Sequence, residues 1–218
     1  MEMSVSSLES LEMYQPGKYK KEDPDYILKF IQQHPFATFV IKGEELLATH
    51  IPVLAEGKAE DFTLYSHIAN HNEQLNFLKE GTEALLIFQG AHAYISSSWY
   101  SKKDISTWDY SAVHVNVKIS LQTKAELEAS LEKLVSNFEK DQKNPLFYKD
   151  IPNKMLEEHL PLITGFSCKP FKIQGIAKLH QKYEKEEVQR VIKNLEDQDS
   201  SSANQLIEDI KKEHGADH

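Results

Sequence analysis

One segment near the middle of the chain combines aromatic, hydroxyl and cationic side chains. Trp99 and Tyr100 begin it, Lys102 and Lys103 follow, and Trp108 stands at its end. Aromatic rings offer flat apolar faces, and ammonium groups form charge-assisted hydrogen bonds with phosphate. These residue types together predict a site for a flat, phosphorylated cofactor. Burial of the same rings in an ordinary core is the alternative that the local sequence leaves open.

A second polar cluster lies where an expected strand meets an expected helix. It contains Ser66, His67, Asn70 and His71, and Asn72 follows it. Free backbone N–H groups and the dipole at the start of a helix attract phosphate. The cluster therefore predicts a phosphate-binding turn. The alternative is that Ser66 ends the strand and Asn72 caps the helix, with no ligand involved.

The other reactive residues predict less. Among the ten histidines, His67 and His71 stand four apart, a spacing that suits two metal ligands on one helix face. No third ligand follows at a defined spacing, so we expect no metal site. Cys168 is the only cysteine, which excludes an internal disulfide and predicts a thiol packed in a strand. No catalytic acid, base or nucleophile can be identified, so the sequence leaves open whether the protein is an enzyme.

The elements that must position these residues are mostly short strands. Apolar and polar residues alternate from Val113 to Leu121, Asp23 and Thr123 are typical helix caps, and the apolar stripe Leu127–Phe138 is expected to face the core. We expect strands over 36–41, 46–54, 62–68, 84–88, 93–96, 113–121 and 163–179, and helices over 24–34, 72–79, 124–140, 152–160, 184–195 and 203–212. Many strands with few helices between them predict an antiparallel barrel in a mainly β, α+β protein.

Composition narrows the range of partners. The net charge of −9 and a single arginine, Arg190, argue against direct binding of duplex DNA, which needs basic patches. No apolar run approaches the ~20 residues of a membrane-spanning helix. The beginning of the chain lacks the basic start and apolar centre of a signal peptide. We therefore expect a cytoplasmic protein with no membrane partner.

Several motifs, taken in their order and spacing, resemble those of one known family. They are Met13–Pro16, His34–Thr38, Ala48–Leu54, Ser66–Ala69, Phe88–Tyr100, Trp108–His114 and Lys178–Gln181. The chain resembles the PaiB-type FMN-binding split-barrel proteins, which are often labelled negative transcriptional regulators. We take residues 13–182 as the family's domain, residues 1–12 as an N-terminal extension and residues 183–218 as a charged helical extension.

The resemblance implies a fold, a cofactor and a site. The fold is an FMN-binding split β-barrel with peripheral helices that forms a homodimer, and FMN or a related flavin would lie at the subunit interface. The implied cofactor contacts are Thr49, His50 and Ile51 at the flavin ring, Ser66, His67, Asn70 and His71 around the phosphate, Lys102 and Lys103 as added charge, and Trp99, Tyr100 and Trp108 as a closing aromatic wall.

Four positions depart from the family pattern, and Glu73 and Ser97, where the family tends to have proline, are two of them. Asn70 stands where the family tends to have arginine or lysine, and Asp109 stands where it usually has asparagine. The loss of one charge-assisted contact predicts FMN binding that is weaker by about ten- to a hundredfold. Asp109 is expected to pair with Lys102 or Lys103, or else the pocket differs. These departures favour, as the alternative function, a regulator or interaction protein with an empty pocket. A haem-binding protein or flavin-dependent reductase of the same fold is a further alternative.

Overall fold

Two compact units make up the described part of the chain. The computed structural model describes residues 13–198 and 200–215. The first unit, here called the helical unit, contains the segment up to Glu22, Ala91–Ser111 and the segment from Gln174 onward. The second, here called the barrel unit, contains Asp23–Gly90 and Ala112–Ile173. The expected domain limits at residues 12 and 182 stay a prediction, and the extension over residues 1–12 lies outside the described residues.

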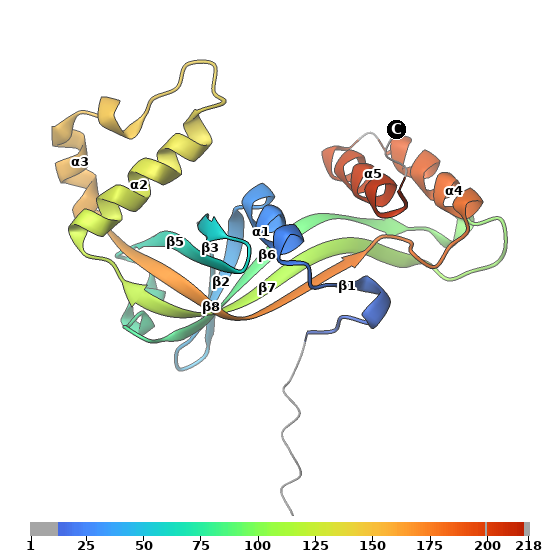
Figure 1. The fold of residues 1–218 in the computed structure, drawn as a ribbon, viewed down its shortest axis with the longest axis horizontal. Helices are drawn as coiled ribbons and strands as arrows, with labels where there is room; N and C mark the ends of the chain where they lie inside the picture. The colour runs from blue at the N-terminus through green and yellow to red at the C-terminus, as the bar shows by residue number, and fades with distance from the viewer. Residues whose placement is uncertain (1–12, 199, 216–218) are drawn as a thin grey trace, which may run out of the picture. The chain divides into compact units, whose positions relative to one another are not determined.

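The barrel unit contains most of the antiparallel sheet drawn in Figure 1, which has the strand order β3-β2-β6-β7-β8-β5-β4. The strands are β2 (Phe36–Lys42), β3 (Leu46–Pro52), β4 (Leu54–Lys58), β5 (Asp61–Ala69), β6 (Glu83–Ile95), β7 (Thr107–Leu121) and β8 (Ile163–Lys178). The two outermost strands, β3 and β4, are separated in the chain by Val53 alone. A sheet whose two edges are joined by one residue must curl round on itself. The expected antiparallel barrel is therefore confirmed.

Alternation along the strands creates the barrel core. In β5 the buried residues are Phe62, Leu64, Ser66 and Ile68. Every second side chain of a strand points to the same face, so these four point inward together. The rings of Phe39 and Phe166 lie 5.4 Å apart in the same core. Helix α1 (Pro24–Gln33) adds Ile27, Phe30 and Ile31 to it, and Asp23 caps this helix as expected.

Several expected elements take a different form, and the expected strand over 113–121 begins earlier, at Thr107. The strand over 46–54 is divided, because Pro52 has no N–H group and the N–H of Val53 donates to Pro35 O at 2.8 Å rather than to a strand. The strands over 84–88 and 93–96 merge into the continuous strand β6. The helix over 72–79 is a single 3-10 turn, η2 (Glu73–Phe77), capped by Asn72. The other 3-10 turns are η1 (Gly17–Tyr19), η3 (Ser97–Trp99), η4 (Tyr148–Asp150) and η5 (Leu160–Leu162).

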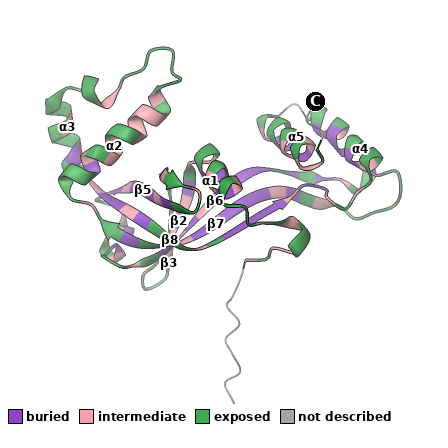
Figure 2. Ribbon diagram, viewed as in Figure 1, coloured by how far each residue is buried: buried purple, intermediate pink, exposed green. Residues whose placement is uncertain are grey.

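Helix α2 (Lys124–Glu139) begins at the expected capping box, in which Thr123 and Glu126 bond reciprocally. Its apolar stripe does not face the core as expected. Leu127 is buried, but Leu131 and Leu134 are half-buried and Phe138 is 39% exposed. Figure 2 accordingly draws the helix mainly in green and pink. Leu127 packs closely on the strand beneath, since a Cβ atom at Gly165 would meet its Cδ1 atom at 2.6 Å. Helix α3 (Asn153–His159) follows in the same connection and buries no residue.

The helical unit has its own core. Helices α4 (Lys185–Glu196) and α5 (Ser201–Glu213) lie side by side in Figure 1 and form an amphipathic pair. Their buried residues join the buried alanines and Ile95 of β6 in a second apolar cluster. The two-residue strand β1 (Lys20–Lys21) pairs with β8 in this unit. None of the helices over the described residues is both long and apolar enough to span a bilayer.

Candidate functional site

The predicted ring-binding residues lie on an edge strand of the barrel unit. Strand β3 ends the sheet and pairs only with β2 among the described strands, with Thr38 opposite His50 and Ala37 opposite Ile51. Ile51 is buried, Thr49 is half-buried and His50 is exposed. One backbone edge of β3 is therefore left without a strand partner. Leu47 O accepts from Gln74 and Pro52 O accepts from Ser66, and the main-chain groups of such an edge that lie between them can pair with a ligand.

A small aromatic surface accompanies this edge. The imidazole of His50 stacks on the ring of Phe36, with centroids 5.8 Å apart and planes 25° apart. Phe36 is 65% exposed, although it is a large apolar side chain. Stacked rings of this kind present a flat face on which another planar group can lie. Phe36 was not among the predicted site residues, because its exposure follows from the cross-strand pairing and not from a local motif.

Ser66 connects the two predicted clusters of the barrel unit. Its hydroxyl is buried and donates to Pro52 O at 2.6 Å, which fixes the end of β3 against β5. The structure thus brings the predicted ring-binding strand and the start of the predicted phosphate turn together. His67, the next residue, is half-buried in β5, and desolvation by burial lowers its pKa. A lowered pKa favours the neutral imidazole at neutral pH.

Asn70 has intramolecular partners for both ends of its side-chain amide. Nδ2 donates to Pro161 O at 2.7 Å, and Oδ1 accepts from the Thr164 hydroxyl at 2.6 Å. Its backbone N–H also donates to Leu162 O. These bonds tie the turn to the beginning of β8. The Asn70 side chain, which was predicted to contact phosphate, therefore stabilises the fold by joining the turn to β8 and the residues before it.

The rest of the turn differs from the expected phosphate site. Because η2 spans five residues, its dipole is much smaller than that of a full α-helix. His71 is exposed in the turn and His67 lies in a strand, so the two are not arranged on one helix face. Over the described residues, no group of three histidine, cysteine or carboxylate side chains is placed to hold a metal ion. The Cys168 thiol is buried, and desolvation raises its pKa to about 12, which leaves it protonated and unreactive.

The remaining predicted contacts lie in the helical unit. Tyr100 is buried, Trp99 is half-buried, and Lys102 and Lys103 are exposed. Both lysines line an open cavity of about 310 Å³, together with Tyr100, Tyr183 and several carboxylates of the 182–187 segment. Three lysines and four carboxylates line this cavity, so it carries no strong charge of one sign.

Trp108 lies on an exposed aromatic face of the helical unit. It is 54% exposed, and its ring lies 6.2 Å from His92 and 6.0 Å from Tyr94. Tyr94 is 46% exposed, whereas its neighbours Ala93 and Ile95 point to the opposite face and are buried in the second cluster. The strand therefore has one side packed within the unit and one side of aromatic rings open to contact.

Asp109 pairs with neither of the lysines that the sequence offered. It is fully buried, and its Oδ2 accepts from His180 Nδ1. The other ring nitrogen of His180 lies 2.9 Å from the Tyr100 hydroxyl. The expectation of a pair with Lys102 or Lys103 was wrong because β7 turns this side chain into the core of the helical unit. The partner of Asp109, His180, belongs to the motif Lys178–Gln181. It lies 71 residues away in the sequence, so no local pattern connects the two residues.

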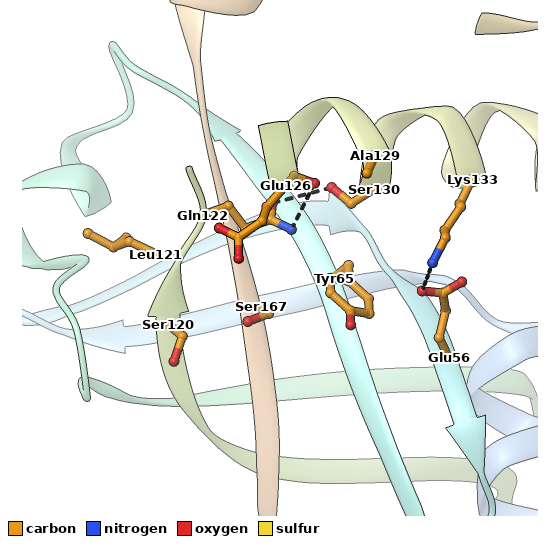
Figure 3. A pocket seen from close by; sticks show the side chains of 10 residues that line it. All are labelled: Glu56, Tyr65, Ser120, Leu121, Gln122, Glu126, Ala129, Ser130, Lys133 and Ser167. Atoms are coloured by element: carbon orange, nitrogen blue, oxygen red, sulfur yellow. Dashed lines mark hydrogen bonds and ion pairs between the residues drawn. The ribbon is translucent and has the colours of Figure 1, made fainter. Parts of the chain in front are cut away.

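One further cavity was not predicted from the sequence. Figure 3 shows it beneath α2, with a volume of about 300 Å³ and with Tyr65 and Ser167 on its strand side. The ion pair of Lys133 with Glu56, at 2.8 Å, stands at one end. Its lining residues come mostly from β4, β5, β7, β8 and α2, so no single stretch of sequence predicts it.

Comparisons with known proteins identify the family of this chain. A family described as “Putative FMN-binding domain” matches residues 13–170. The chain is 34% identical over 197 residues to the protein named Protease synthase and sporulation protein PAI 2 of Bacillus subtilis (strain 168), covering 90% of this chain and 95% of that protein.

Two solved structures share the fold at low sequence identity. They are the FAD and heme binding protein from Mycobacterium smegmatis and the flavocytochrome Anf3 from Azotobacter vinelandii, each with a TM-score of 0.56 and 13% identity. The match covers 78% of this chain in both cases, with 78% of the first structure and 74% of the second. Because the family match and the Bacillus relative both span most of the sequence, the chain belongs to the PaiB-type FMN-binding family.

Proposed function

We propose that this protein binds FMN at the open edge of strand β3, and that it does so as a homodimer. The observation that carries the proposal is the free backbone edge of β3 beside the buried Ser66, in a chain of the FMN-binding family. A flavin ring has polar groups along one edge and a flat apolar body. An unpaired strand edge matches the polar groups, and the exposed rings of Phe36 and His50 match the flat body.

The two ends of the cofactor differ in how well the chain accommodates them. Thr49, His50 and Ile51 would hold the ring, with Ser66 keeping the strand end in place. At the phosphate end, the turn over 66–72 contains no lysine or arginine, and both ends of the Asn70 amide already have partners. We therefore infer that FMN is held mainly through its ring and that its affinity is modest.

A second copy of the chain would complete the site. Exposed Lys102 and Lys103 would supply the positive charge that the turn lacks, and Trp99 and Trp108 would supply the aromatic wall, whereas Tyr100 is buried within its own chain. The open aromatic face around Trp108 and Tyr94 is a surface that a second copy would cover. We propose that these residues reach the flavin of the partner chain.

The chemistry of such a complex belongs to the flavin, which supplies electron or hydride transfer when it is bound. The residues named here bind and orient the cofactor, and none is assigned as a catalytic acid or base. We propose a cytoplasmic location, which a lone buried cysteine favours.

Reconstitution with FMN tests the proposal. Flavin fluorescence is quenched when the ring enters a protein site beside aromatic groups, so titration yields an affinity. Ser66→Ala removes the hydrogen bond to Pro52 O and should weaken FMN binding by about two- to tenfold. Ser167→Ala, a half-buried serine on the neighbouring strand β8, is the matched control and should bind as the natural protein does. Equal affinities for all three proteins would remove β3 from the site.

The alternative function is a regulator or interaction protein whose pocket stays empty. The intramolecular partners of Asn70 favour it, because they stabilise the turn with no ligand present. Such a protein would act through protein partners, since its net charge of −9 disfavours DNA. If the natural protein binds no FMN at any concentration tested, the result would favour the regulator with an empty pocket. A Soret band that the protein retains after incubation with haem would identify a haem site instead.

A further inference from the structure

One imidazole holds both ends of the aromatic loop over residues 100–109. His180 Nε2 lies 2.9 Å from the Tyr100 hydroxyl at the beginning of the loop, and His180 Nδ1 bonds Asp109 at its end. All three side chains are buried in the helical unit. The loop between them has six consecutive exposed residues from Ser101 to Ser106. An exposed loop is thus closed at its base by a single buried side chain.

The protons of this network can be assigned from its partners. The carboxylate of Asp109 only accepts, so Nδ1 of His180 carries the hydrogen. In the tautomer with its hydrogen on Nδ1, Nε2 accepts the hydrogen of the Tyr100 hydroxyl, 2.9 Å away. Desolvation by burial, followed by the hydrogen bond with Tyr183, raises the pKa of Tyr100, so this hydroxyl keeps its proton to donate. Both bonds are satisfied with one proton arrangement.

The backbone of His180 is held in an uncommon conformation. Its φ is 63°, the single positive φ among the non-glycine residues of the described chain. Such a conformation costs energy and persists where the surroundings fix it. The ring is fixed by stacking on Tyr183, with centroids 4.5 Å apart, and on Tyr100 at 5.9 Å. The turn after β8 therefore presents the imidazole to both loop ends at once.

Further bonds fasten the same loop to the same segment. The backbone N–H and hydroxyl of Ser101 donate to Glu187. The Tyr183 hydroxyl donates to Asp104 Oδ2 at 3.1 Å, and Lys178 Nζ donates to Trp108 O at 2.7 Å. The loop is therefore bonded to the segment 178–187 at its two ends and within its length.

We propose that His180 is a positioning residue that clasps the two ends of the loop and thereby fixes the two tryptophans. Trp99 directly precedes Tyr100, and Trp108 directly precedes Asp109, so each tryptophan adjoins one arm of the clasp. Only the consequence for cofactor binding rests on the proposed function. If the tryptophans form the aromatic wall of the flavin site, the clasp determines where that wall stands.

Tryptophan fluorescence tests the clasp without any cofactor. Trp99 and Trp108 are the two tryptophans of the chain, so the emission reports on this loop alone. In His180→Asn, the shorter side chain tolerates a positive φ but cannot reach both partners. Its quenching by acrylamide should rise at least about twofold, because local bonds that hold a loop limit its opening. His159→Asn, an exposed histidine on α3 in the barrel unit, should match the natural protein.

Two conservative variants separate positioning from general destabilisation. Asp109→Asn keeps an oxygen that accepts from Nδ1, so its tryptophan quenching should stay close to that of the natural protein. Tyr100→Phe removes the other arm and should raise quenching, and it replaces His180→Asn as the decisive variant if that protein does not fold. Quenching that is unchanged in a folded His180→Asn or Tyr100→Phe protein, measured well below its melting temperature, would overturn the clasp. An equal rise in Asp109→Asn would overturn the assignment of the Nδ1 hydrogen bond.

Cofactor binding gives the second readout. His180→Asn should weaken FMN binding by about tenfold. In the double variant with Ser66→Ala, the two losses of FMN-binding free energy should add. If the natural protein binds no FMN, the proposed function fails while the acrylamide result still decides the clasp. If FMN binds equally to the natural protein and to His180→Asn although quenching has risen, the clasped loop is not part of the flavin site.

Discussion

Asn70 and Thr164 illustrate how a single side chain can serve the fold in a position where a ligand contact was expected. The Thr164 hydroxyl donates to Asn70 Oδ1 at 2.6 Å, and Asn70 Nδ2 donates to Pro161 O at 2.7 Å. A positively charged residue at position 70 would give up these bonds and gain a contact to phosphate. Stability and FMN affinity of such a variant measure the loss of these bonds and the gain of the phosphate contact.

We expect Asn70→Arg to bind FMN more tightly than the natural protein. One charge-assisted hydrogen bond to phosphate contributes about 1.5–3 kcal/mol, and the lost amide bonds lower the free energy of unfolding by about 1–2 kcal/mol. Titration with FMN and with riboflavin, which lacks the phosphate, separates phosphate binding from ring binding. Equal gains for both ligands would show that the arginine acts on the ring or on packing.

His67 predicts a pH dependence of stability. Burial lowers its pKa in the folded protein below the ordinary value of 6.5. The unfolded chain then binds the proton more readily, so the free energy of unfolding falls as the pH drops below about 6.5. In cofactor-free protein, His67→Gln should lose less stability than the natural protein between pH 7.5 and pH 5.5. Urea unfolding at both pH values measures it, and parallel pH profiles would contradict the burial effect.

At the scale of elements, the strands and helices were largely readable from local sequence. Alternation gave the strands, the Asp23 cap gave α1, and the Thr123 capping box gave α2. What could not be read were features set by distant partners. The division of strand 46–54 depends on Val53 bonding to Pro35 O, and the partner of Asp109 depends on a turn some 71 residues away.

The apolar stripe of α2 shows the same limit. Helical spacing identified the stripe, but only the packing of the connection decides which part of it is covered. Leu127 packs on the strand at Gly165, while Leu131 is half-buried. The site divides in the same way, because its residue types were visible in the sequence and its bonding partners were not.

We expect the two leucines of α2 to differ sharply in stability. Leu127→Ala removes a buried side chain and should lower the free energy of unfolding by about 2–5 kcal/mol. Leu131→Ala, matched in chemistry and helix position, should cost about 1 kcal/mol or less if its side chain stays half-exposed. Urea denaturation of both variants measures the difference. Similar large losses would mean that a second copy or another partner covers the stripe.

At the scale of the whole molecule, the open aromatic face is the feature that most requires a partner. Tyr94 and Trp108 are about half exposed, although large aromatic side chains bury well. A monomer that leaves them in water forgoes apolar burial that a dimer would gain. The proposed function depends on the same dimer, since it draws charge and rings from a second chain.

We expect the protein to be a dimer at micromolar concentration, with an interface above the ~2,000 Å² common in obligate homodimers. Light scattering should give twice the chain mass of 25.1 kDa. Trp108→Glu places a charge on the aromatic face and should raise the fraction of monomer, whereas Phe171→Glu, an exposed aromatic residue of the barrel unit, serves as the control. A monomeric mass for the natural protein would remove the two-chain site.

The absorption spectrum of freshly purified protein, before and after incubation with excess FMN and removal of the unbound cofactor, tests the central claim most directly. The proposed function predicts retained flavin absorbance after incubation, at about one FMN per chain, with a spectrum perturbed from that of free FMN. Because the turn at Asn70 brings no cation, part of this flavin should be lost on prolonged dialysis. A protein that stays colourless after incubation, while folded and dimeric, would contradict flavin binding and leave the empty-pocket regulator as the function.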